Sequence, residues 1–226
     1  LPSQPPQRRD GAQAALLNFA PVLRNRSALA YSLGYMVHTW EMSVLRTWVV
    51  TFLVFTAAHT GNDAPLVSPT AIATALALFG VWASVSGNEL AMRIGRRRFV
   101  FIVMLASMAM ALGIGFASAV SYEFAAILCV LYGALIWADS SSLTAGAAGS
   151  ALPGQRGATL AVHSTMGYAG GFVGPLVVGL ILDLAGGTGV TAWALAFASV
   201  AMIMAIGPMA LLILKPKDLP GDRPRA

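Results

Sequence analysis

The chain has 226 residues, of which 57% are hydrophobic and only 10% are charged, and its mean hydropathy is +0.73. Soluble domains carry about a quarter of charged residues, so this composition excludes an ordinary soluble domain. The net charge is +5, and Cys129 is the single cysteine, which excludes a disulfide framework.

The opening segment is polar and rich in proline. It lacks the basic start, short apolar stretch and small-residue cleavage site of a signal peptide. We therefore expect residues 1–26 to be a cytoplasmic tail or a central linker. The chain begins with Leu1 rather than Met, which indicates that a front portion of the protein is missing.

Six apolar runs follow, and each is long enough to cross the ~30 Å hydrocarbon core of a bilayer as a helix. They are predicted at about 27–56, 68–92, 99–119, 123–150, 157–185 and 190–214. Gly, Pro, Asn and charged residues separate the runs. The sequence therefore predicts an all-α membrane protein with a transmembrane domain over 27–214 and a cytoplasmic tail over 215–226.

The Lys and Arg residues indicate the orientation, because positively charged loops resist translocation. All of them except Arg46 fall in the two tails or in the second and fourth connections, which share one side of a six-pass topology. They are Arg8, Arg9, Arg24, Arg26, Arg93, Arg96, Arg97, Arg98, Arg156, Lys215, Lys217, Arg223 and Arg225. We expect a multi-pass protein of the bacterial inner membrane with both termini in the cytoplasm. Since the basic residues follow the topology, no nucleic-acid partner is expected.

Ionisable side chains within the runs are costly in hydrocarbon and are candidates for function. In the first run, His38 and Glu41 share a helix face, with His38 at ~16 Å depth near the midplane. Arg46 lies on a different face, so it needs another partner or snorkels outward. Asp139 in the fourth run has a similar depth of ~17 Å, and His163 lies about two turns inside the fifth run. We interpret His38, Glu41 and Asp139 as substrate- or proton-binding residues. For His163 alone, an internally paired structural role is the stronger alternative.

Aromatic residues accompany these groups. Tyr35, Trp40, Tyr132 and Trp137 are candidates for lining the same site, with packing or an interfacial position as the alternative. Glu89, Glu123 and Asp183 lie near the ends of their runs, and we interpret them as interfacial.

Small residues are concentrated in the fifth run. The pairs Gly167/Gly171 and Gly170/Gly174 have the small-xxx-small spacing that lets helix backbones approach closely. Gly179 continues the series, and Pro175 predicts a kink. The chain has no Walker-type phosphate loop, and no metal or cofactor is expected.

The second connection reads Gly87-Asn-Glu-Leu-Ala-Met-Arg-Ile-Gly-Arg-Arg-Arg98. It resembles the Gly-x-Leu-Ala-Asp-Arg-x-Gly-Arg-Arg loop of the major facilitator superfamily. The matching residues are Leu90, Ala91, Arg93, Gly95, Arg96 and Arg97. Met92 replaces the family's Asp, and Gly87 is displaced by one position. The run Gly170-x3-Gly174-Pro175-x3-Gly179 resembles the family's Gly- and Pro-rich helix, and the overall resemblance covers about residues 22–214.

This resemblance implies a secondary transporter built from two six-helix halves, each with two inverted three-helix repeats. The chain is then the C-terminal half, helices seven to twelve, and its partners are the N-terminal half, the lipid bilayer and a small-molecule substrate. The family's first and fourth helices in each half line the central cavity, where Glu41 and Asp139 fall here. The segments Tyr35-x4-Trp40-Glu41 and Tyr132-x4-Trp137-Ala-Asp139 show a short sequence similarity that agrees with the repeats.

From the resemblance we expect alternating-access transport coupled to protons, with Arg46 suited to an anionic substrate if it faces the cavity. The arginines of the second connection are expected to form a cytoplasmic latch, for which Glu89 is a candidate partner.

Two other functions are compatible with six helices. An intramembrane serine protease could use the serines at 140–142 with His163, but the chain has no Gly-x-Ser-Gly motif. A metalloprotease is disfavoured because His-Glu-x-x-His is missing. A non-transporting scaffold or regulatory subunit is the second alternative. We therefore expect a transporter and not an enzyme.

Overall fold

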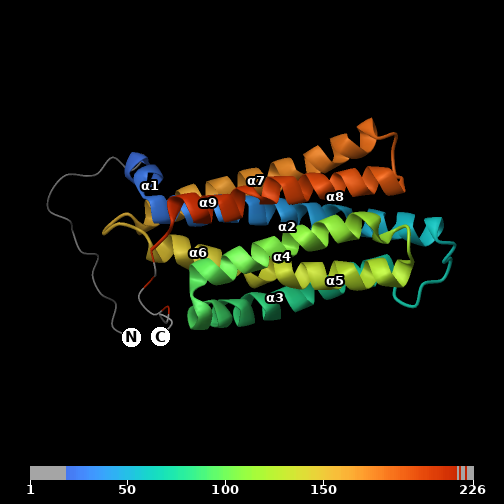
Figure 1. Cartoon of the computed structure of the whole chain (residues 1–226), viewed down its shortest axis with the longest axis horizontal. Coiled ribbons are helices and arrows are strands. Elements are labelled where there is room, and N and C mark those ends of the chain that lie inside the picture. The colour runs from blue at the N-terminus through green and yellow to red at the C-terminus, as the bar shows by residue number, and fades with distance from the viewer. Residues whose placement is uncertain (1–18, 218, 220–221, 223–226) are drawn as a thin grey trace, which may run out of the picture.

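The computed structural model describes residues 19–217, 219 and 222. Every regular element in this described part is an α-helix (Figure 1). The predicted N-terminal tail up to residue 18 lies outside the described residues, as do Arg8, Arg9, Arg223 and Arg225.

The described helices form six apolar spans, two of which are interrupted. A short α1 (Ala20–Arg24) precedes α2 (Arg26–His59), α3 (Pro69–Ile94) and α4 (Arg96–Ala117). The fourth span consists of α5 (Tyr122–Ala138) and α6 (Ser140–Gly149), followed by the continuous α7 (Arg156–Leu184). The sixth consists of α8 (Val190–Met204) and α9 (Ile206–Leu214). The predicted all-α fold with six spans is confirmed.

Short polar side chains begin several of the spans, because they satisfy backbone N–H groups that have no partner within the helix. Asn25 accepts hydrogen bonds from the Ser27 and Ala28 N–H groups at the start of α2. Ser68 accepts one from Ala71 N–H at the start of α3. Between α3 and α4, Gly95 has a φ of 93°, which L side chains rarely adopt. This glycine allows α4 to begin directly at the next residue.

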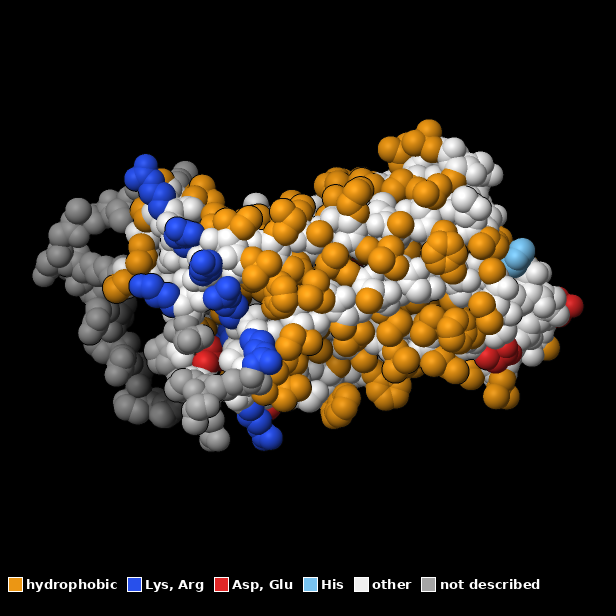
Figure 2. Space-filling view, in the orientation of Figure 1, with side chains coloured by type: hydrophobic (Ala, Val, Ile, Leu, Met, Phe, Trp, Pro, Cys, Tyr) orange, Lys and Arg blue, Asp and Glu red, His pale blue; other side chains and the backbone are white. Residues whose placement is uncertain are grey.

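Charge and hydrophobicity divide the surface into three zones (Figure 2). Lys and Arg side chains gather at one end, called the basic end below, where α2 begins and α9 finishes. Large apolar side chains cover the flank between the two ends. Exposed apolar residues of the spans include Trp82 on α3 and Phe172 on α7, at 71% and 72% exposure. An apolar flank between two polar ends is the surface required of a bundle that crosses a bilayer.

Helix α2 lies at the centre of the bundle and packs against α5, α6, α7 and α9. Its contact with α7 is unusually close. A Cβ atom at Gly170 would overlap the backbone oxygen of Met36, and one at Gly174 would lie 3.0 Å from the backbone oxygen of Trp40. The Thr39 hydroxyl donates to the Gly167 carbonyl at 2.6 Å across the same interface.

The rest of the glycine series also faces α2. A Cβ atom at Gly171 would lie 2.9 Å from the Ser43 hydroxyl, and one at Gly179 would lie 3.2 Å from the Trp48 ring. The Trp48 indole donates to the Pro175 carbonyl at 3.1 Å. Helix α7 continues as one element through Pro175.

Replacing Gly170 with alanine is expected to destabilise the protein by about 1–3 kcal/mol, because the Met36 backbone cannot move aside for the added methyl group. Thermal unfolding of the intact protein in detergent measures the effect. Gly113→Ala on α4 is the matched control, since a Cβ there meets nothing within 4 Å, and alanine favours helix formation. Equal melting temperatures for the two variants would contradict the proposed contact.

Candidate functional site

A buried contact between a histidine and an aspartate joins the first and fourth spans. His38 Nδ1 on α2 lies 2.8 Å from Asp139 Oδ1, and the two side chains are only 1% and 3% exposed. These atoms do not satisfy hydrogen-bond geometry, so the contact is chiefly an attraction between charges when His38 is protonated. An isolated charge is costly in hydrocarbon. In this contact each of the two groups has the other as a neighbour of opposite charge when both are ionised.

Asp139 lies where the fourth span is interrupted. It separates α5 from α6, and its backbone N–H bonds to the Trp137 carbonyl instead of to a carbonyl one full turn back. Helix α3 packs tightly here, because a Cβ atom at Gly87 would overlap the Ala138 carbonyl oxygen. The interruption therefore places a carboxylate inside the bundle at a point where two helices almost touch.

Glu41 is as deeply buried as His38, with 1% exposure. The Tyr132 hydroxyl of α5 and the Asp139 side chain lie in the neighbourhood of its carboxyl group. Glu41 Oε1 and the Tyr132 hydroxyl nevertheless lack a hydrogen bond of regular geometry. Although the sequence places His38 and Glu41 on one helix face, His38 pairs with Asp139 across the helix interface.

Two aromatic stacking contacts extend this group toward α7. The Tyr35 ring stacks on His38 with centroids 5.6 Å apart, and on His163 with centroids 4.0 Å apart. His163 Nδ1 lies 3.5 Å from the Ser32 hydroxyl, and Nε2 lies 3.3 Å from the Thr144 hydroxyl. We call the whole set the polar cluster. Its members are Ser32, Tyr35, His38, Glu41, Tyr132, Asp139, Thr144 and His163.

Sequence reasoning singled out most of the polar cluster but missed Ser32 and Thr144. Ser32 continues the three-residue spacing of Tyr35, His38 and Glu41 along α2, so this periodicity was a usable signal. Thr144 comes from another helix, and no local pattern points to it.

The contacts of His163 also bear on the protease alternative. Its hydrogen-bonding partners in the described part of the chain are Ser32 and Thr144. The Ser141 hydroxyl pairs instead with the Ser84 hydroxyl of α3 at 2.5 Å. No serine of the run 140–142 is paired with His163 among the described residues.

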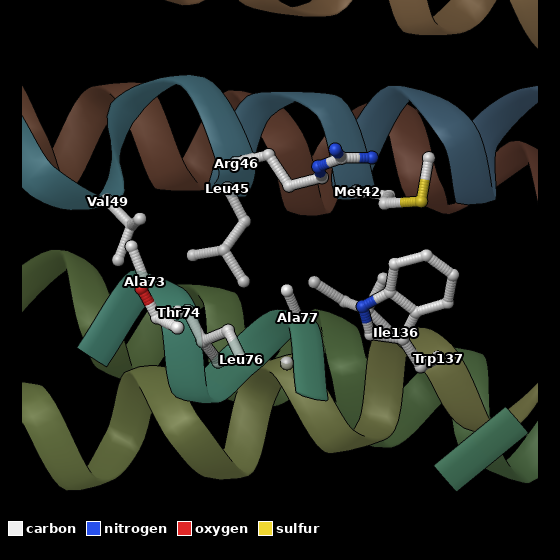
Figure 3. A pocket seen from close by; sticks show the side chains of 11 residues that line it. Met42, Leu45, Arg46, Val49, Ala73, Thr74, Leu76, Ala77, Ile136 and Trp137 are labelled. Carbon is white, nitrogen blue, oxygen red and sulfur yellow. The ribbon is translucent and has the colours of Figure 1, made fainter. Parts of the chain in front are cut away.

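Arg46 and Trp137 lie apart from the polar cluster and line a cavity of about 500 Å³ between α2, α3 and α5 (Figure 3). We call this cavity the arginine pocket. Its lining residues are Met42, Leu45, Arg46, Val49, Ala73, Thr74, Leu76, Ala77, Gly133, Ile136 and Trp137. The structure thus separates the predicted binding residues into a buried titratable group and an open pocket.

At the basic end, one arginine of the second connection is buried and holds several elements together. Arg96 is 4% exposed, and its guanidinium donates to Asn88 Oδ1 at 2.8 Å and to the Ser142 carbonyl at 3.3 Å. It also donates to Asp222 Oδ1 at 3.0 Å, forming an ion pair. Leu219 N–H donates to the other Asp222 oxygen at 3.4 Å.

The other residues of this loop have different positions. Arg93, Arg98 and Leu90 are exposed, and Arg97 is half-buried. Glu89, the candidate partner from the sequence, is also exposed, and the described structure pairs Arg96 with Asp222 instead. Arg96 and Asp222 are 126 residues apart in sequence, so no local pattern could have indicated the pairing.

The family model described as Major Facilitator Superfamily matches residues 15–226. This match includes all six spans, the polar cluster and the loop at 87–98. No curated protein matches the chain.

Breaking the Arg96–Asp222 pair is expected to destabilise the basic end. Arg96→Gln or Asp222→Asn should each cost about 3–5 kcal/mol, because each leaves a buried charge without its partner. The double variant should cost clearly less than the sum of the single losses. Unfolding of the intact protein measures all three variants.

Arg98→Gln serves as the control, since Arg98 lies in the same loop but is exposed. It should change stability by less than about 1 kcal/mol. Strictly additive losses for Arg96→Gln and Asp222→Asn would contradict a direct pairing.

Proposed function

The chain belongs to the major facilitator superfamily of membrane transporters, and from this premise we propose that it is the C-terminal six-helix half of a proton-coupled transporter. The observation that carries the proposal is the buried His38–Asp139 pair, which joins two spanning helices beside the carboxyl group of Glu41. The transporter moves a small solute by alternating access, with the two halves rocking about a site near the middle of the membrane.

The assignment to one six-helix half is supported by the arrangement of the spans, and its placement as the C-terminal half by the decayed loop motif, in which Met92 replaces the family's Asp. The loop at 87–98 connects the second and third spans, and the glycine-rich α7 is the fifth. The helices α2 to α4 and α5 to α9 form two three-span units. Each unit begins with a helix that contributes to the polar cluster, as expected for inverted repeats around a shared site. The N-terminal half is the proposed partner.

The polar cluster is suited to exchange protons in step with a conformational change. His38, Glu41 and Asp139 together carry no net charge when the histidine is protonated, Asp139 is ionised and Glu41 is neutral. Losing one proton leaves a net negative charge, which is costly in hydrocarbon. Proton release is therefore favoured in a conformation that admits water or a compensating ligand. Such a difference between two states is what couples proton movement to transport.

The orientation follows from the distribution of basic residues. We place the basic end in the cytoplasm of a bacterial inner membrane, because Lys and Arg are enriched in cytoplasmic loops. Both ends of the described chain then lie on the cytoplasmic side.

Asp139→Asn is expected to uncouple transport from protons, because asparagine cannot take part in proton exchange at this position. The intact transporter is reconstituted in liposomes that contain a pH-sensitive dye, and a panel of small solutes is applied from outside. The wild type should move protons when a transported solute is added. The variant should lose this solute-driven proton movement to background while it still exchanges labelled solute.

Asp183→Asn is the matched control, because Asp183 is an exposed aspartate near the end of α7. It should behave like the wild type. Solute-driven proton movement that survives in Asp139→Asn would refute the proposed role of the pair.

The orientation predicts a labelling pattern in whole cells. Asp63→Cys lies in an exposed connection at the end opposite the basic end, and Pro153→Cys lies in an exposed connection at the basic end. A membrane-impermeant maleimide should label the first variant in intact cells and the second only after permeabilisation. The native Cys129 is buried and contributes no background. The reverse pattern would overturn the assignment.

A further inference from the structure

We propose that the arginine pocket binds a small organic monocarboxylate with an apolar body, and that Arg46 holds its carboxylate. This inference rests on the proposed function, because it names the class of solute that the transporter carries. Beyond the proposed function, it assigns a binding role to Arg46, which lies outside the polar cluster, and it specifies that the solute carries one negative charge.

The first step is that the charge of Arg46 has no partner within the described part of the chain. Arg46 is the one Lys or Arg residue inside a predicted span, its side chain is exposed to the pocket, and the structure gives it no ion pair or hydrogen bond among the described residues. The pocket lining contains no Asp or Glu. Glu41 and Asp139 are buried in the polar cluster and do not reach the pocket. Arg46 lies eight residues beyond His38, ~12 Å farther along α2, and neither the pocket lining nor the rest of the described chain supplies an anion for its charge.

The second step concerns the walls of the pocket. A volume of about 500 Å³ is within the usual range for small-molecule sites. Leu45, Val49 and Ile136 give it apolar walls, and Trp137 adds an aromatic side chain (Figure 3). Thr74 adds a hydroxyl near the opposite wall. The lining therefore suits a ligand with one charged end and an apolar or aromatic body.

The third step selects the anion. The guanidinium group binds a carboxylate through two parallel hydrogen bonds. A single arginine balances a single negative charge, whereas a doubly charged phosphate ester would leave excess negative charge in the span. A monocarboxylate therefore fits the lining better than a phosphate ester.

The last step is the connection between the pocket and the polar cluster. Trp137 lines the pocket and lies two residues before Asp139, at the interruption of the fourth span. Arg46 and Glu41 are likewise on one helix, α2. A ligand in the pocket therefore rests on the two helices that the His38–Asp139 pair joins. A monoanion carried together with one proton crosses the membrane without net charge.

The test is equilibrium binding of radiolabelled benzoate to the intact transporter in detergent. Benzamide and benzylamine serve as neutral and cationic competitors of the same size. Benzoate should bind to the wild type, and both competitors should be at least about tenfold weaker. Arg46→Gln should weaken benzoate binding by at least about tenfold, and Arg46→Lys should restore part of the loss. Arg98→Gln at the exposed basic end should bind benzoate like the wild type.

Several results would overturn the inference. Benzamide that binds as well as benzoate, or Arg46→Gln with undiminished binding, would remove the carboxylate site. If Arg46→Gln does not fold, the preference of the wild type for benzoate over benzamide decides alone. The measurement is repeated in nanodiscs of phosphatidylglycerol and of phosphatidylcholine. Binding that is lost only in phosphatidylglycerol would assign the pocket to a lipid phosphate and overturn the proposal.

The result also separates this inference from the proposed function. Solute-driven proton movement without benzoate binding would overturn the carboxylate assignment and leave proton coupling intact. Benzoate binding without any solute-driven proton movement would refute proton coupling instead.

Discussion

The requirement that charged groups inside a membrane find partners within the protein governs the architecture of this bundle. Helix α2 meets that requirement by placing Ser32, Tyr35, His38 and Glu41 at three-residue intervals, so that each side chain lies beside the next one along the helix. The opposing groups come from α5, α6 and α7. The glycine series of α7 allows the Tyr35 ring to lie between two helices and to stack on both histidines. The backbone contact and the polar cluster therefore depend on each other.

The fold also connects the buried pair to the basic end through helix α6. Arg96 donates to the carbonyl of Ser142, which is three residues after Asp139, less than one helical turn away. The same guanidinium holds Asp222 of the C-terminal tail. Helix α6 is therefore held by two contacts: the one between Asp139 and His38 just before its first residue, and the hydrogen bond from Arg96 to Ser142 in its first turn. A rotation or shift of this short helix would disturb the Asp139 contact and the Ser142 contact together. This offers a physical link between proton exchange and closure of the basic end.

The sequence was sufficient to predict the spans, but not the pairings of the buried polar residues. Hydropathy is a local property, so the six spans followed directly from it. The spacing of Gly170 and Gly174 likewise indicated a close helix contact, although not that α2 is the partner. The contacts His38–Asp139 and Arg96–Asp222 join distant segments. They depend on how the helices pack, which a single sequence does not encode in any local pattern.

The separation of the pocket from the polar cluster follows from one spacing on α2. Successive residues of an α-helix are ~100° apart, so a five-residue interval turns Arg46 ~140° away from Glu41. An interval of three or four residues would have placed the two charges on one face, where they would neutralise each other. With the observed interval, Glu41 points into the bundle while Arg46 lines the pocket. The helix thereby holds the Glu41 carboxyl group, proposed to exchange protons, and the Arg46 guanidinium group, proposed to bind an anion, within about 8 Å of each other along its axis.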